Sequence, residues 1–241
     1  MMLEILSTGD TVHLFHKNIV IPFRGKRKVL SNSVINGGYQ EDLLGVFNND
    51  CNPGSGMAAK LKGATYESHM AVVAEEMGLH PEKSAGLCTA AAMKNVAIAK
   101  ERFQGLEVTA ILTGGIEHNG GRVGDPASYW DWEEQPQEEE RKLGTINTIL
   151  VIDANLPAHT MVRALITATE AKTAVLQELM APSCYSTGLA TGSGTDGTII
   201  VSNAESALVC QDAGKHGKLG ELIGRTVKKA LKETLIKQNG L

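Results

Sequence analysis

Residues 145–157 read Thr-Ile-Asn-Thr-Ile-Leu-Val-Ile-Asp-Ala-Asn-Leu-Pro, and this stretch is the strongest guide to the fold. The stretch at 145–153, with Ile-Leu-Val-Ile at 149–152, predicts a buried strand. Pro157 follows closely, and proline is typical of the first turn of a helix. We expect this helix to continue to about Met180 and to be the longest in the chain. A buried strand that leads into a long helix indicates an α/β fold.

The first 50 residues predict a series of short strands. Turn signals such as Thr-Gly-Asp and Asn-Gly-Gly separate the extended runs, which lie at 3–6, 11–16, 19–22, 28–30 and 43–47. This opening run of strands argues against a simple doubly wound sheet.

Strands and helices mix in the rest of the chain. Thr65 is a good cap for a helix that ends at Gly78. Further strands are expected at 84–88, 108–112, 198–201 and 206–210. No linker and no internal repeat divides the sequence. We therefore predict an α/β protein of α+β character: a single domain over residues 1–241, with a mixed β-sheet core, a β-rich N-terminal region and long helices at about 157–180 and 218–238.

Composition and charge exclude several classes of protein. The net charge of −4 gives no basic footprint for a nucleic acid. No apolar run approaches the roughly 20 residues that span a bilayer, and the N-terminus lacks the layout of a secretory signal. The four cysteines are scattered, as is usual for reduced thiols. We expect a cytoplasmic protein with no nucleic acid, membrane or metal partner; the sequence leaves a homo-oligomer open.

Ala190-Thr191-Gly192-Ser193-Gly194-Thr195-Asp196-Gly197 is the first of two glycine-rich polar loops. It offers three hydroxyls, one carboxylate and three glycines within eight residues. Glycine lets a backbone approach a ligand closely, and exposed N–H groups in such a turn can hold an anion or a developing oxyanion. The loop lacks the lysine and the spacing of a Walker A motif. It predicts either a ligand-binding loop or a tight polar turn before a strand.

The second polar loop covers residues 113–125 and begins with Thr113-Gly114-Gly115. It follows a predicted strand, which is the usual position of ligand-bearing loops in helix-covered sheets. Its Arg122 and Asp125 either contact a ligand or pair with each other. Asn36-Gly37-Gly38 and Asn48-Asn49 are weaker polar signals of the same kind, and each is otherwise a turn.

The long helix carries Glu170 and Lys172, which lie about 200° apart around a helix axis and cannot reach one point together. Glu170 falls in a polar stripe that is typical of a solvated face. Lys172 falls in a stripe of leucines, so its ammonium either reaches out past the edge of the core or lies at a cleft.

Several spaced motifs resemble the adenosylcobinamide amidohydrolase family. They are Thr113-Gly114-Gly115 with Arg122-Val123-Gly124-Asp125, then Gly144-Thr145-Ile146-Asn147, Glu170-Ala171-Lys172-Thr173-Ala174 and Ala190-Thr191-Gly192-Ser193-Gly194-Thr195-Asp196. The last is the most specific. The resemblance covers about residues 30–205.

The resemblance implies a corrinoid-salvage hydrolase. Such enzymes cleave the amide between aminopropanol and the corrin side chain of adenosylcobinamide, giving adenosylcobyric acid and 1-amino-2-propanol. The cobalt arrives within this substrate, so no protein-bound metal or other cofactor is required. Amide groups such as that of Asn48 would match the amides around the corrin. The residues expected to bind substrate are Asn36, Gly37, Gly38, Gly114, Gly115, Asn119, Arg122, Asp125, Asn147, Thr191, Ser193 and Gly194.

Amide hydrolysis needs a base for water, donors for the oxyanion and a proton for the leaving amine. The predicted catalytic residues are Asp196, Lys172, Thr195 and Glu170. Asp196 is the group expected to position or deprotonate water, and Lys172 to stabilise the oxyanion or protonate the amine. In a rival mechanism Thr195 or Ser193 is the nucleophile and Lys172 its base.

Two other function classes remain open on the sequence alone. One is a corrinoid- or nucleotide-binding protein that uses the same loops without hydrolysis. The other is an enzyme in which residues 190–197 hold a phosphate through backbone N–H groups. The acidic stretch at 131–142 is expected to be a solvated loop or a lid.

Overall fold

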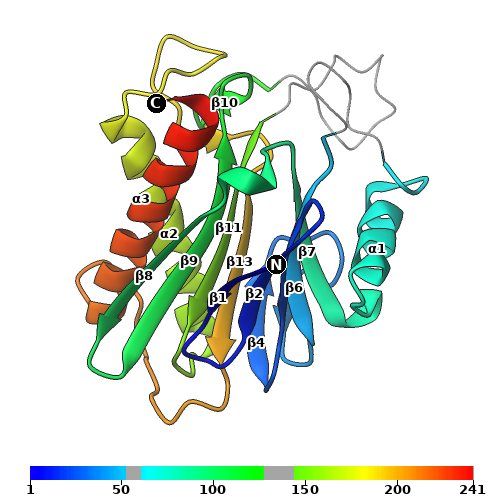
Figure 1. Cartoon of the computed structure of the whole chain (residues 1–241). Coiled ribbons are helices and arrows are strands. Elements are labelled where there is room, and N and C mark those ends of the chain that lie inside the picture. The colour runs from blue at the N-terminus through cyan, green and yellow to red at the C-terminus, as the bar shows by residue number, and fades with distance from the viewer. Residues whose placement is uncertain (53–60, 128–143, 241) are drawn as a thin grey trace.

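Two stacked β-sheets form the centre of the molecule in a computed structural model that describes residues 1–52, 61–127 and 144–240 (Figure 1). The acidic stretch at 131–142 lies outside the described residues. The larger sheet has six strands in the order β5-β4-β13-β11-β9-β8. Its strands are β4 (Arg27–Ser31), β5 (Gly38–Gln40), β8 (Ala97–Phe103), β9 (Leu106–Gly115), β11 (Thr145–Ile152) and β13 (Gly197–Asn203).

The smaller sheet has five strands in the order β1-β2-β3-β6-β7. Its strands are β1 (Met2–Ile5), β2 (Thr11–Phe15), β3 (Asn18–Pro22), β6 (Gly45–Asp50) and β7 (Ser84–Thr89). Strands β6 and β7 are parallel, as are β11 and β13, whereas all other neighbours in both sheets are antiparallel. Both sheets therefore combine the two kinds of pairing, which confirms the predicted mixed β-sheet core.

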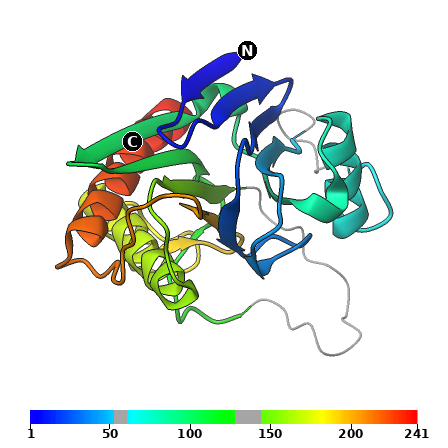
Figure 2. The same cartoon turned by 90° about the horizontal axis from the view of Figure 1, so that it is seen from below.

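Helices cover the two outer faces of this sheet pair (Figure 2). Helices α2 (Ala158–Glu178) and α3 (Lys218–Asn239) pack on the six-stranded sheet, and α1 (Tyr66–Glu76) packs on the five-stranded sheet. Short 3₁₀ turns lie at Pro81–Lys83 and Met93–Asn95. Among the described residues, no helix is long and apolar enough to cross a bilayer.

Three apolar layers hold the stack together. Leu150 and Ile200 face the helices, whereas Ile149 and Val201 face the five-stranded sheet. Phe47 packs beneath α1 on the far side. Every residue of β9 and of β11 is buried, because each strand has a layer on both faces. This explains why residues 149–152 of β11 form a continuous apolar run rather than an alternating one.

The observed elements confirm most of the predicted ones. Thr65 caps α1 through a capping box with Ser68. Pro157 caps α2, which ends at Glu178 and is one residue shorter than α3, so the prediction that it is the longest helix was wrong. The strand expected at 206–210 is also absent there; this segment makes a single bridge, between Val209 and Asn155. The sequence analysis did not predict β5 or β8.

Candidate active site

The two glycine-rich loops meet in a small sheet of their own. Strand β10 (Gly120–Gly121) pairs with β12 (Gly192–Ser193) in antiparallel fashion. Beyond it, the Thr191 N–H donates to the Gly121 carbonyl at 2.8 Å, and the Thr191 hydroxyl accepts from the Val123 N–H at 2.9 Å. Two segments that are distant in the sequence therefore lie side by side.

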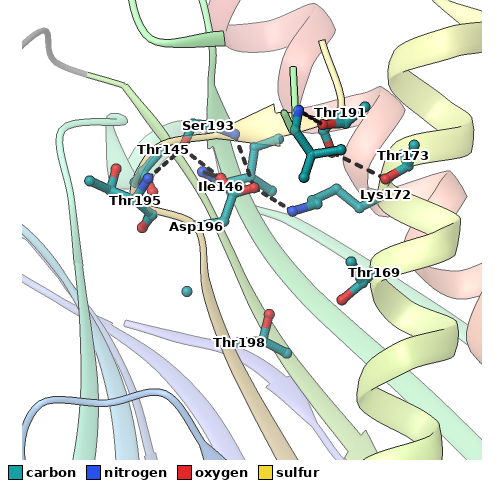
Figure 3. Close-up of polar contacts among 12 residues, drawn as sticks. Thr145, Ile146, Thr169, Lys172, Thr173, Thr191, Ser193, Thr195, Asp196 and Thr198 are labelled. Carbon is teal, nitrogen blue, oxygen red and sulfur yellow. Dashed lines mark hydrogen bonds and ion pairs between the residues drawn. The ribbon is translucent and has the colours of Figure 1, made fainter. Parts of the chain in front are cut away.

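Asp196 organises the first loop (Figure 3). One carboxylate oxygen accepts from the Ile146 N–H at 3.0 Å and from the Ser193 hydroxyl at 2.6 Å. The other accepts from the Ser193 N–H at 3.0 Å and pairs with the Lys172 ammonium. Its side chain is only 13% exposed, so the loop is built around a largely buried, fully bonded carboxylate.

Lys172 reaches Asp196 from the middle of α2 (Figure 3). Its side chain is only 16% exposed, so the ammonium lies at the edge of the core and is largely shielded from solvent. A Cβ at residue 192 would meet the Asp196 carboxylate and come 2.8 Å from the Lys172 Nζ. Glycine at 192 is therefore needed for the loop to close over the ion pair.

Hydrogen bonds to Gly144 and Thr195 fix the outer part of the site. The Gly144 carbonyl accepts from the Thr195 hydroxyl at 3.1 Å and from the Asn119 amide at 2.8 Å. The Thr145 hydroxyl donates to the Thr195 carbonyl at 2.7 Å. Thr195 and Gly194 themselves are exposed. Asn119 thus ties the second loop to the first, and Gly194 and Thr195 form the surface that a ligand can reach.

Asn147 connects this site to the five-stranded sheet. Its amide donates to the Asn48 side chain at 2.8 Å and to the Cys88 carbonyl at 3.0 Å, and its carbonyl oxygen accepts from the Gly197 N–H at 3.1 Å. Asn48 in turn donates to the Thr113 hydroxyl at 2.8 Å. Asn147 and Asn48 are 1% and 3% exposed, so both are buried between the sheets instead of facing a substrate as expected.

Arg122 and Asp125 shape the end of the second loop. Asp125 accepts from the Arg122 N–H and from the Ser183 hydroxyl, both at 3.1 Å. Desolvation is the largest single effect on the Asp125 carboxyl and raises its pKa, but hydrogen bonds from Ser186, Arg122 and Ser183 and the Arg122 charge together outweigh it and lower the pKa. The Arg122 guanidinium lies 3.5 Å from the Leu189 carbonyl, so the two side chains serve the loop rather than each other.

Other predicted residues lie apart from the Asp196 cluster. Glu170 extends from another face of α2 and pairs with Lys215 at 3.4 Å, with both side chains at least half exposed. Gly114 lies beneath α3, where a Cβ would come 3.1 Å from Leu235, and Gly115 lies near Gln238. These two glycines allow a helix, rather than a ligand, to approach the sheet.

The Asn36-Gly37-Gly38 turn is also separate from the cluster. The Asn36 amide donates to the carbonyls of Pro81 at 2.6 Å and Ser84 at 2.8 Å, which fixes this turn to the start of β7. A Cβ at residue 37 would meet the Ser33 carbonyl, and Gly38 begins the edge strand β5 with φ +78°. Each of the three residues therefore has a structural role in the turn.

Two contributors to the site were not singled out from the sequence. The Ile146 N–H is a backbone donor that no side-chain pattern reveals. Asn32 accepts from the Thr198 N–H at 2.8 Å and donates to the Asp196 carbonyl at 2.9 Å. Its only signal was an amide side chain directly after a predicted strand.

Comparison with known proteins now places this chain in a family. The profile of the family described as adenosylcobinamide amidohydrolase matches residues 4–241, a longer span than the motifs cover. The chain belongs to this family. A relative in Methanocaldococcus jannaschii, named "Uncharacterized protein MJ1613", is 37% identical over 235 residues, which are 92% of this chain and 87% of the relative.

Among solved structures, the PH0078 protein from Pyrococcus horikoshii OT3 is similar at a TM-score of 0.47 and 12% identity. The match covers 91% of this chain and 77% of that one. The likeness is too distant to bear on function.

Proposed function

We propose that this protein hydrolyses the amide between aminopropanol and the corrin side chain of adenosylcobinamide. The products are adenosylcobyric acid and 1-amino-2-propanol. The observation that carries the proposal is the Lys172–Asp196 ion pair, held where the two glycine-rich loops meet. Family membership supplies the substrate class.

The ion pair provides both partners of a proton cycle. In the proposed reaction the attacking oxygen bonds to the carbonyl carbon, and its proton passes to the Asp196 carboxylate. The C–N bond then breaks while the Lys172 ammonium gives a proton to the leaving amine. Because Lys172 and Asp196 are in direct contact, the proton returns from the carboxyl to the amine of Lys172 and restores the pair.

Stabilisation of the oxyanion is assigned to Lys172 and to the exposed part of the first loop at 194–195. The cost of losing an essential donor of this kind is about 3–4 kcal/mol of transition-state stabilisation in comparable sites. Since Asp196 already bonds to its own loop and to Ile146, these donors are held in place before substrate arrives. No protein-bound cofactor enters the scheme, and cobalt enters as part of the substrate.

The attacking oxygen is either a water molecule or the hydroxyl of Ser193. Ser193 already donates to Asp196 at 2.6 Å, the arrangement needed to remove its proton. Replacement of Ser193 by alanine separates the routes. A loss of turnover of at least about 100-fold, or about 2.7 kcal/mol, together with an acyl adduct on Ser193 detected by mass spectrometry in the wild type, indicates a covalent acyl-serine intermediate, which a water molecule then hydrolyses to the free acid. Turnover within about tenfold of the wild type indicates attack by water.

The proposal is tested by incubating the wild-type protein with adenosylcobinamide and measuring both products by mass spectrometry. Equal amounts of adenosylcobyric acid and 1-amino-2-propanol are expected. Tight binding of the corrinoid without release of the amine would instead identify a corrinoid-binding protein that uses the same loops. If the protein neither binds the corrinoid nor releases the amine, both assignments are contradicted.

A further inference from the structure

A cavity lined by polar and aromatic side chains lies on the other face of β6, outside the Asp196 cluster. It has a volume of about 520 Å³ and is bounded by the ends of β2, β3 and β6, by Lys62 and by α1. Its position at the carboxyl end of the parallel strand β6 is where sheets covered by helices commonly bind ligands. The volume lies within the usual range for small-molecule sites.

The floor of this cavity is a neutral hydrogen-bond network. The Asn49 amide donates to the Asn18 side chain at 2.7 Å, and its carbonyl oxygen lies 3.2 Å from the His69 Nε2. The Lys62 N–H donates to the His69 Nδ1 at 3.1 Å, which leaves Nε2 to carry the ring proton. Burial, followed by the nearby Lys62 charge, lowers the pKa of His69. The floor therefore presents uncharged polar groups.

The charged groups around the cavity are paired. Lys17 lies 3.8 Å from Asp50 and Lys62 pairs with Glu76. Each lysine among the described lining residues thus has a carboxylate beside it, so this part of the lining offers no unpaired cation for a phosphate. Asp50, whose side chain is 10% exposed, adds a carboxylate that can accept hydrogen bonds from sugar hydroxyls.

The rim of the cavity is aromatic. Phe15 and His16 lie at the turn between β2 and β3, with ring centroids 4.4 Å apart at 71°. Phe15 is 45% exposed, although a phenylalanine at a turn is usually more stable when covered. An exposed ring beside amide groups is the arrangement that proteins use to stack and read a nucleobase.

We propose that this cavity binds the adenine nucleoside carried by the adenosylated corrinoid. The inference rests on the proposed function for the identity of the substrate. The base stacks on Phe15 with the edge-on His16 ring beside it, the Asn49 amide reads its N6 and N7 edge, and Asp50 accepts from the ribose hydroxyls. The two sites lie at the same end of the stacked sheets, because Asn147 near the start of β11 contacts Asn48 and Cys88 near the ends of β6 and β7.

The test measures nucleoside binding without any hydrolysis. Saturation-transfer difference NMR with 5′-deoxyadenosine should show transfer to the H2 and H8 protons of the base, and uridine should show at least fivefold less. Phe15→Ala should raise the dissociation constant for 5′-deoxyadenosine at least fivefold. Phe103→Ala is the matched control, since Phe103 is 44% exposed at a different strand turn and should bind like the wild type.

Absence of transfer to 5′-deoxyadenosine, equal transfer to uridine, or unchanged binding in Phe15→Ala would overturn the inference. Its failure is distinct from failure of the proposed function. Amine release without nucleoside binding would retain the hydrolase and reject this site. Nucleoside binding that depends on Phe15, without amine release, would retain this site and reject the hydrolase.

Discussion

Two polar networks lie at the same end of the stacked sheets, and they differ in charge. In the six-stranded sheet, Asp196 joins an ammonium, a hydroxyl and two backbone N–H groups. In the five-stranded sheet, Asn49 joins Asn18 and His69 through neutral groups. A charged network can take up and return a proton, whereas a neutral one can only donate and accept hydrogen bonds. The difference assigns chemistry to the first network and recognition to the second.

Removal of the charge from the first network should have the largest effect on stability. Asp196→Ala leaves the Lys172 ammonium mostly buried without its partner, so the free energy of unfolding should fall by about 3–5 kcal/mol. Denaturant unfolding measures this. Glu170→Ala is the control on the same helix, because its pair with Lys215 is exposed and should contribute less than about 1 kcal/mol. Equal losses in the two variants would remove the distinction between these ion pairs.

The connection between the networks should have an intermediate effect. Asn147→Ala leaves the buried Gly197 N–H and Cys88 carbonyl without this partner, which should cost about 1–3 kcal/mol for each group left unpaired. Asn32→Ala removes two similar bonds at an exposed position and should cost less. Thermal and denaturant unfolding of both variants compare them. A larger loss in Asn32→Ala would show that burial does not set the strength of the link.

The neutral network should be sensitive to acid. Burial lowers the pKa of His69 below its ordinary 6.5, so the unfolded chain binds more protons than the folded one as the pH falls through that value. The contribution of His69 to stability is present above pH 6.5 and is lost as the pH falls toward its folded pKa. The free energy of unfolding measured from pH 7.5 to 5 should therefore decline more steeply in the wild type than in His69→Gln. Parallel curves would mean that His69 is not held neutral.

The sequence predicted the elements best where local signals and burial agree. The apolar run at 149–152 predicted the buried strand β11, and Thr65 predicted the start of α1; both predictions were confirmed. Strand β8 was missed because its sequence, Ala-Ile-Ala-Lys-Glu-Arg-Phe, combines alanines with charges, which are poor indicators of a strand. Its alanines are small because α3 packs on that face. The stacking of two sheets depends on contacts between distant segments, which no local pattern contains.

The candidate site shows the same limit. The glycine, hydroxyl and charge patterns singled out the two loops, Asp196 and Lys172, but they left open whether Lys172 reaches solvent or lies at a cleft. The same glycine signal pointed to Gly114, where the close neighbour is Leu235 of α3. A glycine indicates that another group lies close to the backbone, but it does not indicate whether that group belongs to a ligand or to a helix. Likewise, an asparagine indicates that its amide forms hydrogen bonds, but not with which partner. The Asn147 amide bonds to Asn48 of the other sheet rather than to a substrate.

The most direct test of the central claim is the rate of 1-amino-2-propanol release from adenosylcobinamide by variants of the ion pair. Lys172→Met and Asp196→Asn should each lower kcat/KM at least about 100-fold, and the double variant should be little worse, because the two groups act as a unit. Glu170→Gln should retain nearly full activity. Near-normal kcat/KM in either single variant of the ion pair, or an equal loss in Glu170→Gln, would contradict the account.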